Sequence, residues 1–290
     1  MAVTLYGSPQ SRSLRVIWVA AELGLAIDHI PFAWYDPALK AAEFLAINPA
    51  GRVPVIVDGD LALPESLAIT LYLAKTYAPA DADPLYPTNP HDEARAWSWT
   101  HWAIFDLEAP LDTLRRHRFL LPEAERLEAV AREAEQRVGP ALAVLDDVLA
   151  STPYLLGERF SVADLNVACV LSPSRTVFID LEPFARVRGW LDRCRSRPAW
   201  TAARRALQAE EFPSPASATS RPQGLRRLPR RHRPAGVRRT RVMGLRPTKL
   251  FSIATYPASS SLRRCTERLP SVACSRLFRA LNSATCSPAR

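Results

Sequence analysis

Apolar positions in the first 79 residues follow two periods, one typical of strands and one of helices. Short runs of β-branched or apolar residues alternate with segments in which the apolar residues are spaced as in a helix. Gly24 follows the first of these helical segments, at the C′ position that glycine favours. The dipeptide Asp58-Gly59 is a hairpin turn signal, so the strands on either side of it pair antiparallel. With one short helix within residues 34–49, the order is β-α-β-α-β-β-α. The expected strands are Ala2–Tyr6, Ile27–Phe32, Val53–Val57 and Leu61–Leu63, and the longer helices are Ser11–Leu23 and Glu65–Tyr77.

A Pro- and Asp-rich linker at residues 80–89 separates this module from a segment that is helical throughout. Mixed apolar and charged faces from residue 90 to about residue 211 predict an all-α bundle. The fold class is therefore α+β, with an all-helical second domain. The expected helices are 90–119, 123–151, 161–178, 183–196 and 199–209.

The net charge of +9 comes entirely from the last quarter of the chain. Residues 212–290 hold 16 Arg, one Lys and one acid, Glu267, whereas residues 1–211 have a net charge of −7. Because the folded part is acidic, it is not expected to bind nucleic acid. Residues 212–290 are rich in Pro, Ser and Arg without periodicity, which predicts a disordered basic tail. Such a sharp change of composition also fits out-of-frame translation or a fusion, and both interpretations stay open.

Other compositional features exclude several classes of protein. No run of about 18 apolar residues occurs, so no membrane-spanning helix is expected, and the N-terminus lacks a secretory signal pattern. Five Cys at irregular spacing predict neither disulfides nor a zinc site, and His101 and His117 lack partners at metal-ligand spacing. These observations predict a cytoplasmic protein without a metal.

Five stretches of residues 1–209 together resemble the cytosolic glutathione S-transferases. The resemblance implies a thioredoxin-like glutathione-binding domain at 1–79 and a helical domain with a second-substrate pocket at 90–211. It also implies a bacterial member of serine type, similar to the theta, phi or zeta classes, that forms a homodimer and acts in detoxification. The stretches are YGSPQSRSLRV (Tyr6–Val16), LGL (Leu23–Leu25), NPAGRVPVI (Asn48–Ile56), LPESLAITLYL (Leu63–Leu73) and LGERFSVAD (Leu156–Asp164).

The activity that the resemblance implies requires a thiolate, with glutathione as co-substrate and a small electrophile as second substrate. A hydroxyl donor and a helix N-terminus together lower a thiol pKa. Ser11 best matches the hydroxyl position of the serine classes, although it is also suited to capping the helix. Ser8 and Ser13 lie in the same turn and stay as alternatives, whereas no cysteine lies there for a thiol-exchange mechanism.

The residues that would bind glutathione follow from the same resemblance. Val53 would pair its backbone with the ligand as an added strand does. A proline at position 54 costs a sheet hydrogen bond, which indicates a cis peptide bond, although an edge strand would also tolerate this proline. Ser66 would hold a ligand carboxylate at a helix N-terminus, Glu65 would hold the α-ammonium, and Arg52 would pair with the glycine carboxylate. Capping alone also explains Glu65 and Ser66.

In the helical domain, Trp102 and Phe105 share a helix face that would line the second-substrate pocket, although an aromatic stripe is more often core. Ser161 and Asp164 form a capping box, so Asp164 is read as a folding residue. The main rival function is a non-catalytic glutathione-binding or scaffold protein of the same fold. A second rival is a platform whose basic tail binds acidic partners or nucleic acid.

Overall fold

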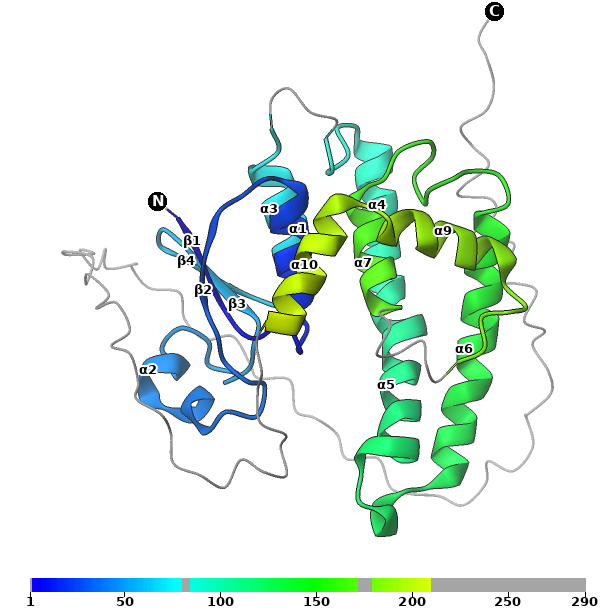
Figure 1. The fold of residues 1–290 in the computed structure, drawn as a ribbon, viewed down its shortest axis with the longest axis horizontal. Coiled ribbons are helices and arrows are strands. Elements are labelled where there is room, and N and C mark those ends of the chain that lie inside the picture. Colours follow the sequence, from blue (N-terminus) through cyan, green and yellow to red (C-terminus); the bar gives the residue numbers. More distant parts are fainter. Residues whose placement is uncertain (1, 80–83, 172–178, 210–290) are drawn as a thin grey trace, which may run out of the picture. The chain divides into compact units, whose positions relative to one another are not determined.

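The computed structural model describes residues 2–79, 84–171 and 179–209, the last three by backbone only. Its four-stranded sheet has the order β2-β1-β3-β4 (Figure 1). β1 is parallel to β2 and antiparallel to β3, and β3 and β4 form the expected hairpin. This is the predicted α+β, thioredoxin-like domain followed by a helical domain. The strands are β1 (Val3–Tyr6), β2 (Ile27–Ile30), β3 (Val55–Asp58) and β4 (Leu61–Pro64).

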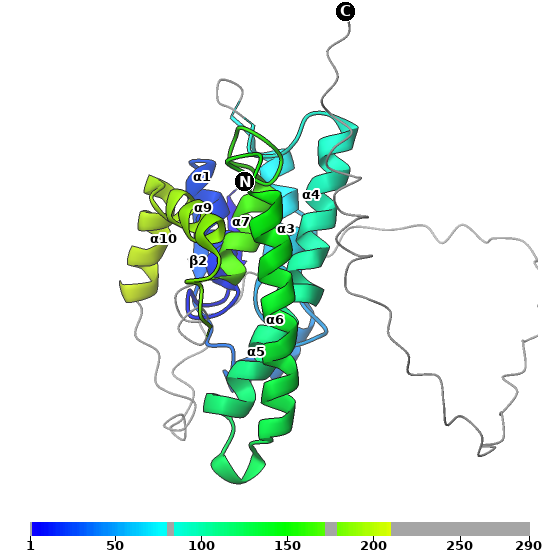
Figure 2. The same cartoon turned by 90° about the vertical axis from the view of Figure 1, so that its right-hand side faces the viewer.

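Helices α1 (Ser13–Glu22) and α3 (Ser66–Thr76) lie side by side, between the sheet and the helical domain (Figures 1 and 2). Gly24 has a φ of 61° and ends α1 in a Schellman arrangement, since the next N–H donates to the Ala20 carbonyl at 2.9 Å. The short helix expected within residues 34–49 is present as a 3-10 turn, Pro37–Lys40, and α2, Ala42–Leu45.

The helical domain departs from the prediction of one continuous helix over residues 90–119. Helix α4 (Pro90–Trp102) passes into a π-helical segment, Ala103–Glu108, before α5 (Ala109–Arg115). Pro110 explains the change, because proline has no N–H for the carbonyl four residues back and its ring clashes with that carbonyl. The remaining elements are a second π-helical segment (Arg116–Leu120), a 3-10 turn (Glu123–Glu125), α6 (Glu128–Val148), α7 (Val162–Val170), α9 (Ala185–Arg195) and α10 (Pro198–Ala209).

Helix α7 is the centre of the helical domain, because all nine of its residues are buried. It is apolar on every side except at Asp164 and Asn166. The Asp164 carboxylate accepts hydrogen bonds from the Ser161 N–H and hydroxyl, the Leu155 N–H and Trp190 Nε1, at 2.8–3.0 Å. Burial raises its pKa, although these four donors oppose the shift. The capping box is therefore confirmed, and the buried Asp164 carboxylate joins the start of α7 to Leu155 and Trp190.

A buried polar network joins the two domains through α7. Thr70 of α3 donates to Asn166 Oδ1 at 2.8 Å, and Asn166 Nδ2 donates to Thr100 of α4 at 3.1 Å. All three side chains are at most 3% exposed, so each needs its partner in this environment. Across the described ranges, no helix is both long and apolar enough to cross a membrane. The expected tail, 212–290, lies outside the described residues, as do 80–83 of the linker and 172–178.

Candidate functional site

The sheet register gathers the predicted glutathione site at one edge of the sheet. Tyr6 at the end of β1 lies opposite Val55 at the start of β3, and Val55 lies opposite Pro64 at the end of β4. Three segments distant in sequence must therefore meet where these strands end or begin. They are Gly7–Ser11, Val53-Pro54 and Glu65-Ser66.

Ser11 lies in the turn between β1 and α1 and is half-buried. Its hydroxyl donates to the Ser8 carbonyl at 2.7 Å, and its oxygen accepts the Ser13 N–H at 3.1 Å. Ser11 therefore satisfies the N–H group of the first residue of α1, although the N-cap position weighed for it from the sequence is held by Arg12. To contact a ligand's sulfur, the hydroxyl has to turn away from Ser8.

The alternative serines are less accessible than Ser11. Ser13 is fully buried, and Ser8 is 1% exposed. The Ser8 hydroxyl has no hydrogen-bond partner within the described chain. Ser11 is thus the serine of this turn that a ligand reaches without displacing protein atoms.

The loop before β3 is held in place by a cis peptide bond and by the side chain of Asn48. The Val53-Pro54 bond is cis, as predicted, and β3 begins only at Val55, so the proline precedes the strand and removes no sheet hydrogen bond. The Asn48 side chain donates to the Arg52 carbonyl at 2.6 Å and accepts from the Ala50 N–H at 3.1 Å. These bonds fix the loop, while the Arg52 side chain is exposed.

Lys40 adds a second positive charge to this loop. Its Nζ donates to the Gly51 carbonyl at 3.1 Å. Gly51 has a φ of 58°, and a Cβ there would lie 2.7 Å from Lys40 Nζ and 2.8 Å from the Leu39 carbonyl oxygen, so only glycine fits. An anionic group beside this loop would face two cations, Lys40 and Arg52.

Glu65 and Ser66 stand at the N-terminus of α3. Glu65 has a φ of 71°, a value that residues other than glycine rarely adopt and that is concentrated at functional sites. Its carboxylate is exposed, and no described residue binds it. Ser66 is 4% exposed. The N-terminus of α3 therefore carries an acidic side chain, Glu65, without a partner among the described residues, beside a buried hydroxyl, Ser66.

Arg15 controls the hydroxyl of Ser66. Its Nη1 donates to Ser66 Oγ at 3.0 Å, so the Ser66 proton remains available for an acceptor at the start of α3. The Arg15 guanidinium is buried, and its Nη2 lies 2.8 Å from Glu108 Oε1 as an ion pair without hydrogen-bond alignment. Burial lowers the pKa of Arg15, but the interactions with the Glu108 carboxylate and with Cys169 together outweigh burial, so the pKa is raised. A buried ion pair from the helical domain thus supports the start of α3.

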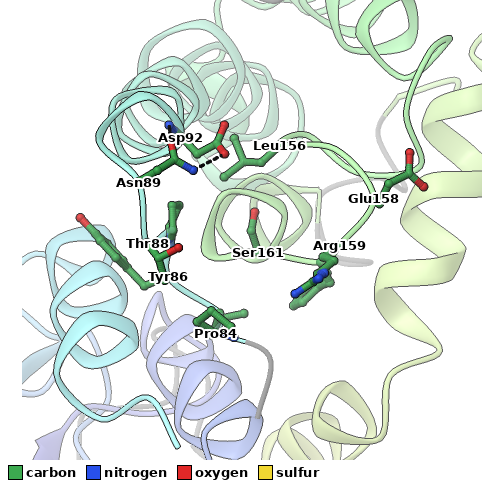
Figure 3. A pocket seen from close by; sticks show the side chains of 12 residues that line it. Pro84, Tyr86, Thr88, Asn89, Asp92, Leu156, Glu158, Arg159 and Ser161 are labelled. Carbon is green, nitrogen blue, oxygen red and sulfur yellow. Dashed lines mark hydrogen bonds between the residues drawn. The ribbon is translucent and has the colours of Figure 1, made fainter. Parts of the chain in front are cut away.

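One pocket of the described chain lies away from these residues (Figure 3). It has a volume of about 340 Å³ and lies between residues 84–92 and 156–161. None of the predicted site residues lines it. The two helices that begin there are already capped, α4 by the Asn89 side chain and α7 by Ser161 and Asp164. Within the described ranges, no group of three or more His, Cys, Asp or Glu side chains could hold a metal ion.

Comparison with known proteins finds matches to both parts of the chain. A profile described as "Glutathione S-transferase, N-terminal domain" matches residues 1–75, and the corresponding C-terminal domain profile matches residues 128–193. Glutathione S-transferase 3 of Zea mays is 33% identical over 223 residues, covering 74% of this chain and 98% of the maize protein. The chain belongs to the glutathione S-transferase family.

Solved members of the glutathione S-transferase family share the fold. The theta class enzyme of Xanthomonas axonopodis pv. citri, crystallised with glutathione bound, is 33% identical with a TM-score of 0.61, over 70% of this chain and 96% of that one. Glutathione transferase F7 of Populus trichocarpa is 26% identical with a TM-score of 0.62, over 71% and 99% of the two chains.

Sequence reasoning missed several groups at this candidate site of the glutathione S-transferase. The positive φ of Glu65 and the contacts of Lys40 carry no signal in the spacing of residues. Arg15 and Glu108 were passed over because each reads as an ordinary charge within an amphipathic helix, although their positions, 93 residues apart, become neighbours in the fold. The glycine at position 51 was the one local sign that something packs closely against the loop.

The two aromatic residues predicted to line a second-substrate pocket are placed differently from each other. Trp102 is 9% exposed and packs edge-on against Trp99 with ring centroids 5.1 Å apart, so it belongs mainly to the core. Phe105 is 63% exposed and lies in the π-helical segment, which breaks the three-residue spacing that put both on one face. The pocket itself stays a prediction.

Proposed function

We propose that the protein is a glutathione transferase of the serine type, in which Ser11 stabilises the glutathione thiolate for attack on an electrophilic carbon or a peroxide. The observation that carries this proposal is the meeting of three segments at one sheet edge, with a carboxylate at Glu65 that no described residue binds and an accessible hydroxyl at Ser11. A thiol with a pKa near 8.5 is mostly protonated at pH 7, so stabilising the thiolate raises the reactive fraction.

In this proposal each group at the site has one task. The Glu65 carboxylate holds the α-ammonium of the glutamyl residue, and the Ser66 N–H and hydroxyl hold its carboxylate at the N-terminus of α3. The Val53 backbone pairs with the cysteinyl residue as an added strand. Arg52, with Lys40 beside the same loop, attracts the glycine carboxylate. The N-terminal end of α1 adds its partial positive charge near the sulfur.

The electrophile is expected at the helical domain next to Ser11. Arg12 follows Ser11 directly, and its Nε donates to Glu108 at 2.8 Å. The π-helical segment that ends at Glu108 therefore lies against the start of α1. Phe105, an exposed aromatic of that segment, supplies apolar surface for a second substrate. Holding both reactants there would supply the advantage of proximity.

A non-catalytic glutathione-binding protein is the second candidate, and one observation favours it. The Ser11 hydroxyl is already satisfied by Ser8 and Ser13, so it has no obligatory need of a ligand. Rates of conjugation with 1-chloro-2,4-dinitrobenzene and of hydroperoxide reduction, measured beside glutathione affinity, separate the two. Tight binding without either rate would select the binding protein.

Glu65→Ala and Ser66→Ala should each weaken glutathione binding by about 1.5–3 kcal/mol, the range for hydrogen bonds to charged groups. Isothermal titration calorimetry measures this loss directly. Glu133→Ala is the matched control, because Glu133 is an exposed acid of α6 far along the chain from the site. Melting curves accompany Ser66→Ala, since it also removes the acceptor of Arg15. Unchanged affinity in both site variants would place the ligand elsewhere.

The protein is expected to be a two-fold homodimer that uses α3 and α4. Trp97 on α4 is 46% exposed and stacks on His101, one turn away, at 6.0 Å between ring centroids. Apolar surface of this kind is typical of a subunit contact, and isologous pairing is the commonest arrangement. Light scattering should give twice the monomer mass at micromolar concentration. Trp97→Glu should lower that mass, whereas Phe119→Glu, at another exposed aromatic, should not; a monomeric wild type would refute the expectation.

A further inference from the structure

Ser13 is fully buried next to the turn that carries Ser11, and its hydroxyl occupies space that is free only because residue 7 is a glycine. A Cβ at position 7 would lie 2.1 Å from Ser13 Oγ and 3.2 Å from Val53 Cβ, so a side chain there would displace the Ser13 hydroxyl. The φ of Gly7, 142°, also favours glycine. The turn thus reserves room for one hydroxyl group that no solvent reaches.

The direction of the hydrogen bond between Ser11 and Ser13 follows from counting protons. The two hydroxyl oxygens are 2.9 Å apart, and Ser11 Oγ is also 2.7 Å from the Ser8 carbonyl oxygen. A carbonyl only accepts, so the single Ser11 proton goes to Ser8. Ser13 is therefore the donor to Ser11. Ser11 Oγ receives both the hydroxyl and the backbone N–H of Ser13.

This arrangement lets the Ser11 proton turn toward a ligand at small cost. The Ser8 carbonyl also accepts the Ser11 backbone N–H at 3.0 Å, so it keeps a partner when the Ser11 hydroxyl leaves. The two donors from Ser13 stay in place during that rotation and hold the oxygen still. A hydroxyl that accepts hydrogen bonds is polarised and becomes a stronger donor.

We infer that Ser13 is a positioning residue for thiolate stabilisation: its buried hydroxyl donates to Ser11, and so strengthens the hydrogen bond that Ser11 gives to the glutathione sulfur. The inference rests on the proposed function, because it requires Ser11 to meet the sulfur. Ser13 itself touches no substrate. Its effect on the bound thiol therefore has to pass through the Ser11 hydroxyl.

The test is the pKa of bound glutathione, read from thiolate absorbance across a pH series, in a double-mutant cycle of Ser11→Ala and Ser13→Ala. Ser13→Ala alone should raise this pKa by roughly 0.3–0.7 unit, a two- to fivefold lower thiolate fraction at pH 7, from the loss of cooperative strengthening. In the Ser11→Ala background it should produce no further shift. Glutathione affinity should stay near the wild-type value throughout.

Ser13→Thr keeps the hydroxyl and should keep the wild-type pKa, which separates the hydrogen bond from mere packing. If Ser13→Ala does not fold, Ser13→Cys fills the same space with a weak donor and should give the same upward shift. Two outcomes would overturn the inference but leave the proposed function. In the first, Ser13→Ala shifts the pKa of bound glutathione equally whether Ser11 is present or replaced. In the second, Ser11→Ala shifts this pKa and Ser13→Ala does not. No shift from either serine, with glutathione bound, overturns both.

Discussion

Ser11→Ala should reduce conjugation near pH 7 far more than it reduces glutathione binding. The hydroxyl would contact the sulfur, so it discriminates thiolate from thiol, whereas Val53, Glu65 and Ser66 hold the rest of the peptide. Loss of one charge-assisted hydrogen bond should raise the pKa of the bound thiol by about 1–2 units, roughly 1.5–3 kcal/mol. At neutral pH the thiolate fraction then falls about ten- to a hundredfold.

A pH–rate profile, with thiolate absorbance of the bound complex, measures this effect. A thiol whose bound pKa is raised deprotonates at higher pH, so alkaline conditions should restore much of the Ser11→Ala rate. Ser8→Ala is the matched control, because its hydroxyl is in the same turn but 1% exposed. If Ser8→Ala shifts the pKa and Ser11→Ala does not, the sulfur lies against Ser8. If no serine of the turn shifts it, the binding protein without catalysis is the better description.

Glu108→Ala should destabilise the protein by about 3–5 kcal/mol, because it leaves the buried Arg15 guanidinium without its counter-charge. Both side chains are at most 3% exposed, and Arg12 also donates to the same carboxylate oxygen. Such a loss is a large part of the net stability of most domains. Chemical denaturation with one spectroscopic probe for each domain measures it.

The Glu108 experiment has an internal control in the same ion pair. Arg15→Met combined with Glu108→Leu removes both charges, and replacing a buried pair by apolar residues is often neutral or stabilising. The double variant should therefore recover much of the lost stability. It should still bind glutathione more weakly, since Ser66 loses the donor that orients its hydroxyl. Asp112→Ala, at a more exposed partner of Arg12, should cost much less. Equal losses for Asp112→Ala and Glu108→Ala would contradict the assigned importance of the buried pair.

This ion pair connects the two proposed halves of the site. Glu108 belongs to the segment beside which the electrophile is expected, and Arg15 reaches from it to Ser66 at the proposed glutathione carboxylate site. A substitution in the helical domain can therefore alter glutathione affinity without touching the ligand. For each substitution in the helical domain of this glutathione S-transferase, the affinity for glutathione and the preference for the electrophile should therefore be measured together.

The amino-acid sequence by itself determined the features that depend on contacts between residues close together in the chain. The hairpin after β3, the end of α1 at Gly24 and the cis bond before Pro54 each depend on a few neighbouring residues, and the structure confirms all three. The hairpin turn itself is Gly59-Asp60, because Asp58 still pairs with Leu61. The succession of strands and helices along the first domain, and the division into a sheet domain and a helical domain, followed from two hydrophobic periods; the sheet order β2-β1-β3-β4 did not. Asp164 was interpreted as a folding residue because a capping box can be recognised from two residues three positions apart, here Ser161 and Asp164.

Only the tertiary structure decided which groups face the site and what state they are in. That Ser11 is accessible while Ser8 and Ser13 are buried depends on how the turn packs against the loop at Val53. The break of the long helix near Pro110 sets where Glu108 meets Arg15, across 93 residues of sequence. Spacing along a chain encodes neighbours three or four residues apart, whereas the direction of a hydroxyl proton depends on partners that folding alone brings together.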